Sequence, residues 1–149
     1  MNPVDVTEGT SPIVLGMPHS GTYVPAEAEA KLNVLGRELS DTDWHIPQLY
    51  DGLLPGASIV RANFHRYVID PNRGPDGTSL YPGQNTTGLC PLTTFDNAPI
   101  WREGQEPDEE EIAQRLQQFH APYHRVLQEM IDNVKARHGY AILYDCHSI

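Results

Sequence analysis

The chain has 149 residues, of which 39% are hydrophobic and 20% are charged, and its formal net charge is −10. This composition is typical of one soluble globular domain, and the acidic balance argues against nucleic acid or an anionic membrane as a partner, because both bind basic surfaces. A small anionic substrate stays compatible with it, since a few arginines can reverse the field inside one pocket. The first residues lack a basic and then apolar leader, and no apolar run reaches membrane-spanning length, so we expect a cytoplasmic protein.

The first sixty residues predict alternating strands and short helices. An apolar run bounded by turn-forming residues is typical of a buried strand. Alanine, glutamate and lysine favour a helix in the segment that follows, and a Ser or Asp ahead of an apolar stretch suits a helix N-terminus. The expected elements are a strand at 12–16, a loop at 17–21, a helix at 25–35, a helix from Ser40 or Asp41 to Leu49 or Tyr50, and a strand at 57–62.

The middle of the chain combines short apolar runs with a long irregular stretch. The run at 67–70 predicts a third strand, which Pro71 should end because proline has no N–H to donate to a neighbouring strand. Residues 74–88 are rich in glycine and proline, so we expect a long loop there, and loops of that length are often functional. A further short strand is expected within 93–101.

The last third of the chain predicts one long helix followed by a strand. Apolar residues recur at three- and four-residue spacing over 112–134, which is the pattern of an amphipathic helix. Pro107 and the acidic residues after it suit the start of that helix, and Gly139 suits its end. We expect Pro122 to kink the helix. The apolar run at 140–144 then predicts a buried strand.

This alternation of strands and helices predicts an α/β protein with a mainly parallel sheet. Ligands of open α/β sheets bind beyond the carboxyl ends of the strands. His19 follows the first expected strand and His147 follows the last one. The two histidines are therefore candidates for one shared site.

A catalytic zinc ion takes three protein ligands, commonly histidine and carboxylate, and keeps one position open. His19 and His147 could supply two of them, and the third could be Asp41, Asp43 or His45 near the start of the second expected helix. Two further histidines, His120 and His124, are four residues apart on the long helix. They lack an evident third partner, so we interpret them as partly exposed side chains rather than as ligands.

Three arginines lie close together around the second and third expected strands: Arg61, Arg66 and Arg73. A guanidinium group can bind a carboxylate through two parallel hydrogen bonds, so these residues are candidates for binding an acidic substrate. The alternative is that they pair with the nearby carboxylates of Asp70 and Asp76.

Four segments of the chain stand out together: PHSGTYVP at 18–25, SDTDWHIPQLYD at 40–51, ASIVRANFHRYVIDPNRGPDG at 57–77 and DCHS at 145–148. In this order they resemble the N-formylglutamate amidohydrolases. The most specific part of the resemblance is HRYVIDPNR at 65–73 together with DCHS.

The resemblance implies a fold, a reaction and a set of site residues. The fold would be a three-layer αβα arrangement with a mixed, mostly parallel sheet, similar to zinc carboxypeptidases and of the phosphorylase/hydrolase-like type. The reaction would be hydrolysis of the formamide bond of N-formyl-L-glutamate, the last step of a histidine degradation route. By position, His19, Asp43 and His147 match the ligands of Zn²⁺ or another divalent metal, with Asp41 close enough to be confused with Asp43. The residues that match the substrate-carboxylate binders are Arg66, Asn72 and Arg73.

Members of this family are considerably longer, and a glutamate suited to act as general base lies in their later part. We therefore expect residues 1–149 to be the N-terminal part of a single amidohydrolase domain, truncated, poorly active alone and prone to self-association through an uncovered strand. One alternative is a related zinc amidase or carboxypeptidase-like hydrolase that acts on another N-acyl amino acid. The other is a non-catalytic fragment that binds zinc or an acidic metabolite.

Overall fold

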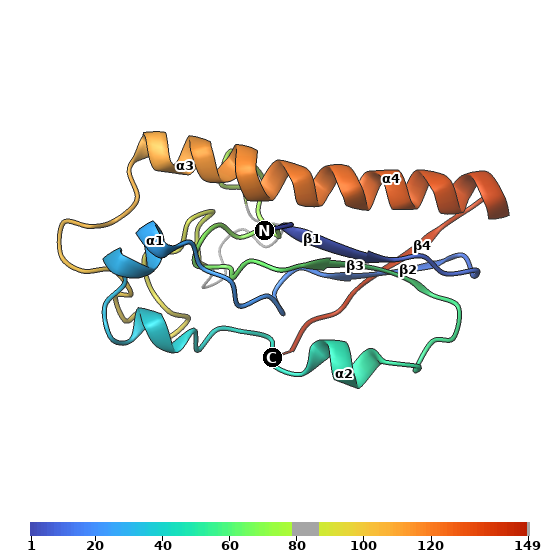
Figure 1. Cartoon of the computed structure of the whole chain (residues 1–149), viewed down its shortest axis with the longest axis horizontal. Helices are drawn as coiled ribbons and strands as arrows, with labels where there is room; N and C mark the ends of the chain where they lie inside the picture. Colours follow the sequence, from blue (N-terminus) through green and yellow to red (C-terminus); the bar gives the residue numbers. More distant parts are fainter. Residues whose placement is uncertain (79–86, 149) are drawn as a thin grey trace.

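The computed structural model describes residues 1–78 and 87–148, which form a mixed four-stranded sheet with helices on both faces (Figure 1). The strand order is β1-β3-β2-β4. β2 runs parallel to β3 and to β4, whereas β1 runs antiparallel to β3. The α/β class and the mixed sheet agree with the prediction. The strands are β1 (Val4–Thr7), β2 (Ile13–Met17), β3 (Ser58–Ala62) and β4 (Ile142–Asp145).

Alternating side chains of the central strands pack on opposite faces of the sheet. Val14 and Val60 belong to a buried cluster with residues of the long helix α4 (Ala121–His138). Leu15 and Met17 belong to a second cluster with Ile46 of the short helix α2 (Ile46–Tyr50). Figure 1 shows the same arrangement, with α4 along one face of the sheet and α2 beneath the other.

The predicted long helix is present but consists of three joined segments. α3 (Glu109–Arg115) is capped by Asp108, whose carboxylate accepts from the backbone N–H of Glu111 while the Glu111 side chain accepts from the backbone N–H of Asp108. This reciprocal capping lies one residue after the predicted start. A π-helical segment, η2 (Leu116–His120), leads into α4 (Ala121–His138), which Gly139 ends with φ of 81°. The widened turn lies directly ahead of Pro122, the residue at which a kink was predicted. In an ordinary α-helical turn, the proline ring would crowd the carbonyl four residues earlier.

The two helices predicted before β3 are shorter than expected. α1 (Ala26–Lys31) ends where Leu32 becomes extended, and a single 3₁₀ turn, η1 (Gly36–Glu38), follows. α2 starts at Ile46, so the predicted N-cap at Ser40 or Asp41 was wrong. The Asp41 carboxylate instead accepts hydrogen bonds from the Tyr67 hydroxyl and the Phe95 backbone, so it does not cap a helix.

Three strand predictions also differ from the structure. Residues 67–70 are buried but are not a strand. The chain turns at 66–68, where the N–H of Val68 donates to the carbonyl of His65, and the N–H of Asp70 donates to the carbonyl of Leu89 in a loop. The stretch at 93–101 contains isolated bridges rather than a strand. The predicted strand at 140–144 begins at Ile142 and is exposed rather than buried, since it lies at an edge of the sheet. Most of the loop predicted at 74–88 lies outside the described residues.

None of the helices in residues 1–78 and 87–148 is long and apolar enough to cross a membrane.

Candidate metal centre

The parallel pairing of β2 and β4 brings two histidines together. The strands pair with Gly16 opposite Asp145, and the N–H of Cys146 continues the pairing by donating to the carbonyl of Gly16 at 2.8 Å. His19 and His147 each lie two residues beyond their strand, so their rings meet at the same edge of the sheet. The ring centroids are 5.1 Å apart.

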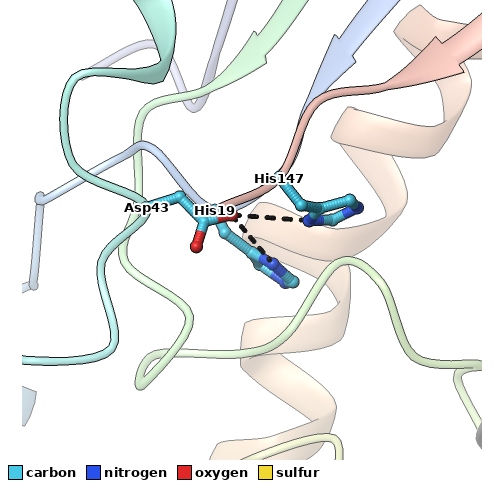
Figure 2. A group of neighbouring side chains, drawn as sticks. All are labelled: His19, Asp43 and His147. Atoms are coloured by element: carbon cyan, nitrogen blue, oxygen red, sulfur yellow. Dashed lines mark ion pairs between the residues drawn. The ribbon is translucent and has the colours of Figure 1, made fainter. Parts of the chain in front are cut away.

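Asp43 completes the group from the turn that precedes α2 (Figure 2). Its backbone N–H donates to the carbonyl of His19 at 3.0 Å, which fixes the turn against the end of β2. The hydroxyl of Ser148 donates to Asp43 Oδ1 at 3.0 Å. The other carboxylate oxygen, Oδ2, faces the two rings, 3.4 Å from His147 Nδ1 and 3.8 Å from His19 Nδ1.

These three side chains fit a metal ion. Their donor atoms lie within 4.8 Å of one another. In the described part of the chain, His19, Asp43 and His147 form the group of three ligand-type side chains that could hold a metal ion. Asp43 Oδ2 is buried, and among residues 1–78 and 87–148 no hydrogen bond satisfies it. A buried carboxylate oxygen without a partner is costly, and an imidazole–carboxylate–imidazole set is a common zinc environment. That His19, Asp43 and His147 bind a metal stays a prediction.

The electrostatics of the group keep Asp43 ionised. Burial would raise the pKa of Asp43, but the contacts from His147, His19 and Ser148 together hold that pKa below its ordinary value. Burial lowers the pKa of His19 and outweighs the opposing contact with Asp70. An ionised Asp43 beside a neutral His19 ring is the protonation state that metal binding requires of these two groups.

A second carboxylate, that of Asp70, contacts the His19 ring at Nε2, the nitrogen that does not face Asp43. His19 Nε2 lies 2.7 Å from Asp70 Oδ1, which also accepts from the backbone N–H of Asn72 at 2.8 Å. Arg66 donates to Asp70 Oδ2 at 2.9 Å. Burial would raise the pKa of Asp70, but His19, Arg66 and Arg73 hold it well below its usual range. An anionic Asp70 assigns the proton of His19 to Nε2, so Nδ1 presents its lone pair towards Asp43.

Asp70 was not predicted as a site residue, because from the sequence alone it is only a possible partner for an arginine. A usable signal existed, since Asp70 ends a buried apolar run two residues ahead of the Asn72-Arg73 pair. The alternatives for the third ligand lie elsewhere. Asp41 bonds to Tyr67 and Phe95, and His45 is an exposed residue with φ of 63° at the start of α2.

The three arginines occupy different surroundings. Arg66 is buried, bonds to Asp70 and lies with its guanidinium carbon 4.6 Å from the centre of the Phe95 ring. Arg73 donates to the backbone carbonyls of Thr87 and Asn72 and lies 3.9 Å from Asp70. Arg61 pairs with Asp5 on an exposed part of the sheet, so it is not part of the site. Asn72 and Arg73 line a cavity of about 810 Å³ between residues 71–75 and the long helix.

The fold and the site define a class of protein: an α/β protein with a candidate metal centre at the carboxyl ends of parallel strands. A family model described as N-formylglutamate amidohydrolase matches residues 11–149. The chain belongs to this family.

Relatives of known name and structure agree with the family. The chain is 46% identical to N-formylglutamate deformylase from Pseudomonas aeruginosa over 142 residues, and 44% identical to that from Pseudomonas putida over 143 residues. Each match covers 95% of this chain but 53% of the relative, so the chain spans about half the length of these relatives.

Two solved structures have the same fold. The crystal structure of N-formylglutamate amidohydrolase from Ralstonia eutropha superposes with a TM-score of 0.83 at 27% identity, covering all of this chain and 59% of the other. A gene product of Agrobacterium tumefaciens superposes with a TM-score of 0.75 at 20% identity, covering all of this chain and 57% of the other.

Proposed function

We propose that this chain supplies the metal centre and the substrate-binding arginines of an enzyme that hydrolyses N-formyl-L-glutamate to L-glutamate and formate. The observation that carries the proposal is the convergence of His19 and His147 on the buried, unpaired Oδ2 of Asp43. The proposed substrate is taken from the names of the Pseudomonas relatives, which are N-formylglutamate deformylases. A zinc-carboxypeptidase-like architecture, a role in histidine degradation and a cytoplasmic location belong to the same proposal.

The metal ligands would be His19 Nδ1, Asp43 Oδ2 and His147 Nδ1. A zinc ion bound there would polarise the formyl carbonyl and activate a water molecule at neutral pH. Asp70 keeps the proton of His19 on Nε2, and Ser148 holds the second oxygen of Asp43, so both ligands stay oriented. Pre-orientation of this kind keeps donor atoms in place without reorganisation during the reaction.

The substrate has two carboxylates, which Arg66, Asn72 and Arg73 would bind. Among the contacts of the described residues, Arg66 donates to Asp70 through Nη2, which leaves the rest of its guanidinium fork for a ligand. Arg73 and Asn72 line the neighbouring cavity. A carboxylate held by an arginine fork fixes the substrate in one orientation and so positions the formyl carbon.

The test uses a chimera, because the chain spans about half the length of its curated relatives. Residues 11–148 replace the matching half of the Pseudomonas aeruginosa deformylase, and formate release from N-formyl-L-glutamate is measured with zinc present. We expect turnover that disappears, together with bound zinc, in the His147→Ala and Asp43→Asn variants. A chimera that folds and binds zinc but releases no formate would count against the substrate.

A substrate panel separates the proposed reaction from related ones. N-formyl-L-aspartate, N-acetyl-L-glutamate and an N-formyl amino acid with a neutral side chain are compared with N-formyl-L-glutamate. If one of these is hydrolysed with higher kcat/KM, the chain belongs to an amidase for another N-acyl amino acid. Zinc binding with no hydrolysis of any of them would favour a binding role.

A further inference from the structure

Two histidines of the long helix bond to the backbone of the segment that carries Asp70. His120 Nε2 lies 2.8 Å from the carbonyl oxygen of Arg73, and His124 Nε2 lies 2.7 Å from that of Pro71. The two rings are neighbours, with centroids 4.5 Å apart. His120 is the last residue of the π-helical segment η2, and His124 lies in the first turn of α4. A π-helical turn often marks a functional site. Both histidines were predicted to be partly exposed and not to bind a metal, yet His120 is buried.

The hydrogen bonds assign the protons of both rings. A backbone carbonyl accepts and cannot donate, so each Nε2 must carry a proton. Burial lowers the pKa of His120 despite the opposing contact with Arg73. A neutral His120 with its proton on Nε2 is therefore the form that holds the Arg73 carbonyl.

The segment 70–73 is thus held from two sides. Towards the candidate metal centre, Asp70 accepts from His19 and Arg66. Towards the long helix, the carbonyls of Pro71 and Arg73 accept from His124 and His120. Asp70 can orient His19 only if its own backbone stays in place, and the two histidines tie the residues that follow Asp70 to the long helix.

We propose that His120 and His124 are positioning residues of the candidate metal centre, acting through residues 70–73 on Asp70 and so on His19. The inference rests on the proposed function in one respect, since its readout is metal bound by His19, Asp43 and His147. Neither histidine touches the donor atoms. Their contribution is to keep the Asp70 carboxylate where it holds the His19 ring.

Paired substitutions isolate the hydrogen bonds. In the His120→Gln/His124→Gln double variant, each amide nitrogen can replace the Nε2 donor. In the His120→Leu/His124→Leu double variant, the donors are lost while apolar volume is kept. Arg125→Ala, at the exposed position that directly follows His124 on the same helix, is the matched control.

Zinc affinity of the 149-residue chain is measured by competition with a chromophoric chelator, and the visible spectrum of the cobalt-loaded chain reports ligand geometry. We expect the leucine pair to bind zinc about tenfold more weakly, the low end of the effect of groups that orient ligands, and to alter the cobalt spectrum. We expect the glutamine pair to stay within about twofold of the unsubstituted chain and Arg125→Ala to match it.

Thermal unfolding of the metal-free variants separates positioning from a merely structural role. A leucine pair that lowers Tm but leaves zinc affinity and the cobalt spectrum unchanged overturns the proposal, as does a glutamine pair as damaged as the leucine pair. If the leucine pair does not fold, the single His124→Leu variant, at an exposed ring, decides in the same way. Zinc binding that is absent from the unsubstituted chain, or indifferent to His147→Ala, overturns the metal centre itself, and this failure is visible before any helix variant is made.

Discussion

His19 Nε2 lies 2.7 Å from Asp70 Oδ1, and both side chains are buried. The pair links an imidazole that faces Asp43 with a carboxylate that also receives Arg66. A carboxylate behind a histidine fixes the ring and raises the basicity of its far nitrogen, which is how ligands of metal sites are commonly oriented. The same contact explains why Asp70 ends a fully buried apolar run.

Asp70→Asn should weaken zinc binding by about 10–100-fold, because the amide keeps an acceptor oxygen but loses the charge that orients His19. Chelator competition on the 149-residue chain measures the loss. Asp5→Asn is the control, since Asp5 also pairs with an arginine but lies on an exposed part of β1. Equal zinc affinity of Asp70→Asn and Asp5→Asn would show that the carboxylate does not support the ligand.

Arg73→Lys keeps the charge but loses the planar fork, so in the chimera it should raise KM for N-formyl-L-glutamate strongly. The effect should be much smaller for an N-formyl substrate without a side-chain carboxylate, which would identify that carboxylate as the partner. Arg61→Lys serves as the control, because Arg61 pairs with Asp5 away from the site. A KM that does not change in Arg73→Lys rules out this role.

The approximate positions of the candidate ligands could be predicted because strand ends are easy to recognise. The apolar run before His19 and the one before His147 each indicated a strand, and parallel strands bring their carboxyl ends together. The surroundings of Asp41 and Asp43 could not be predicted, since they depend on distant partners: Tyr67 and Phe95 for Asp41, Ser148 for Asp43.

The errors in secondary structure have the same origin. Residues 67–70 are as apolar as a strand, but the hydrogen bond from Val68 to His65 closes a turn at 66–68, and Asp70 donates to Leu89 in a loop. Burial of Ile142 and its neighbours was overestimated because hydropathy does not tell a central strand from an edge strand. The roles of Asp70, His120 and His124 depend on contacts between segments about fifty residues apart, which spacing does not reveal.

Gly21→Ala should lower both stability and zinc affinity. A methyl group at Gly21 would lie 2.5 Å from backbone atoms of Asn63 and Phe64, so the loop that carries His19 would have to move away from the end of β3. We expect a loss of about 1–3 kcal/mol in the free energy of unfolding, measured by urea titration of the metal-free chain. Gly88→Ala is the control, because a methyl group there meets nothing within 4 Å. The steric argument fails if the two variants are equally stable.

His65→Asn should reduce the acid sensitivity of the metal-free chain. His65 is fully buried, its Nδ1 accepts from the N–H of Tyr67, and burial, followed by Arg66 and His19, lowers its pKa from 6.5 to about 3. Below about pH 6.5 the unfolded chain therefore binds a proton that the folded chain does not, and stability falls with pH by up to about 1.4 kcal/mol per pH unit until about pH 3. Asparagine keeps an acceptor for the Tyr67 N–H but does not titrate.

Urea unfolding between about pH 5 and pH 7 measures the two slopes, in a range where few carboxylates titrate. Burial lowers the pKa of His19 as well, and His19 is present in both proteins, so the difference between the slopes isolates His65. The absolute stability of His65→Asn is not the readout, since the smaller side chain leaves space in the core at every pH. Parallel slopes would mean that His65 takes up its proton in the folded state.

The edge strand β4 should make the 149-residue chain self-associate. β4 pairs with β2 on one side and lies at the end of the strand order, and the side chains of Ile142, Leu143 and Tyr144 are about half exposed. An uncovered edge with apolar side chains is a template for another strand.

Leu143→Lys places a charge on this edge, a device that natural edge strands use against pairing. The substitution should shift the chain towards monomer in sedimentation velocity over a range of concentrations. Val6→Lys on β1 is the matched control, because Val6 and Leu143 are both 45% exposed while β1 already carries Asp5 beside Val6. If Leu143→Lys associates as strongly as the unsubstituted chain, or if Val6→Lys alone becomes monomeric, the contact between copies does not involve β4.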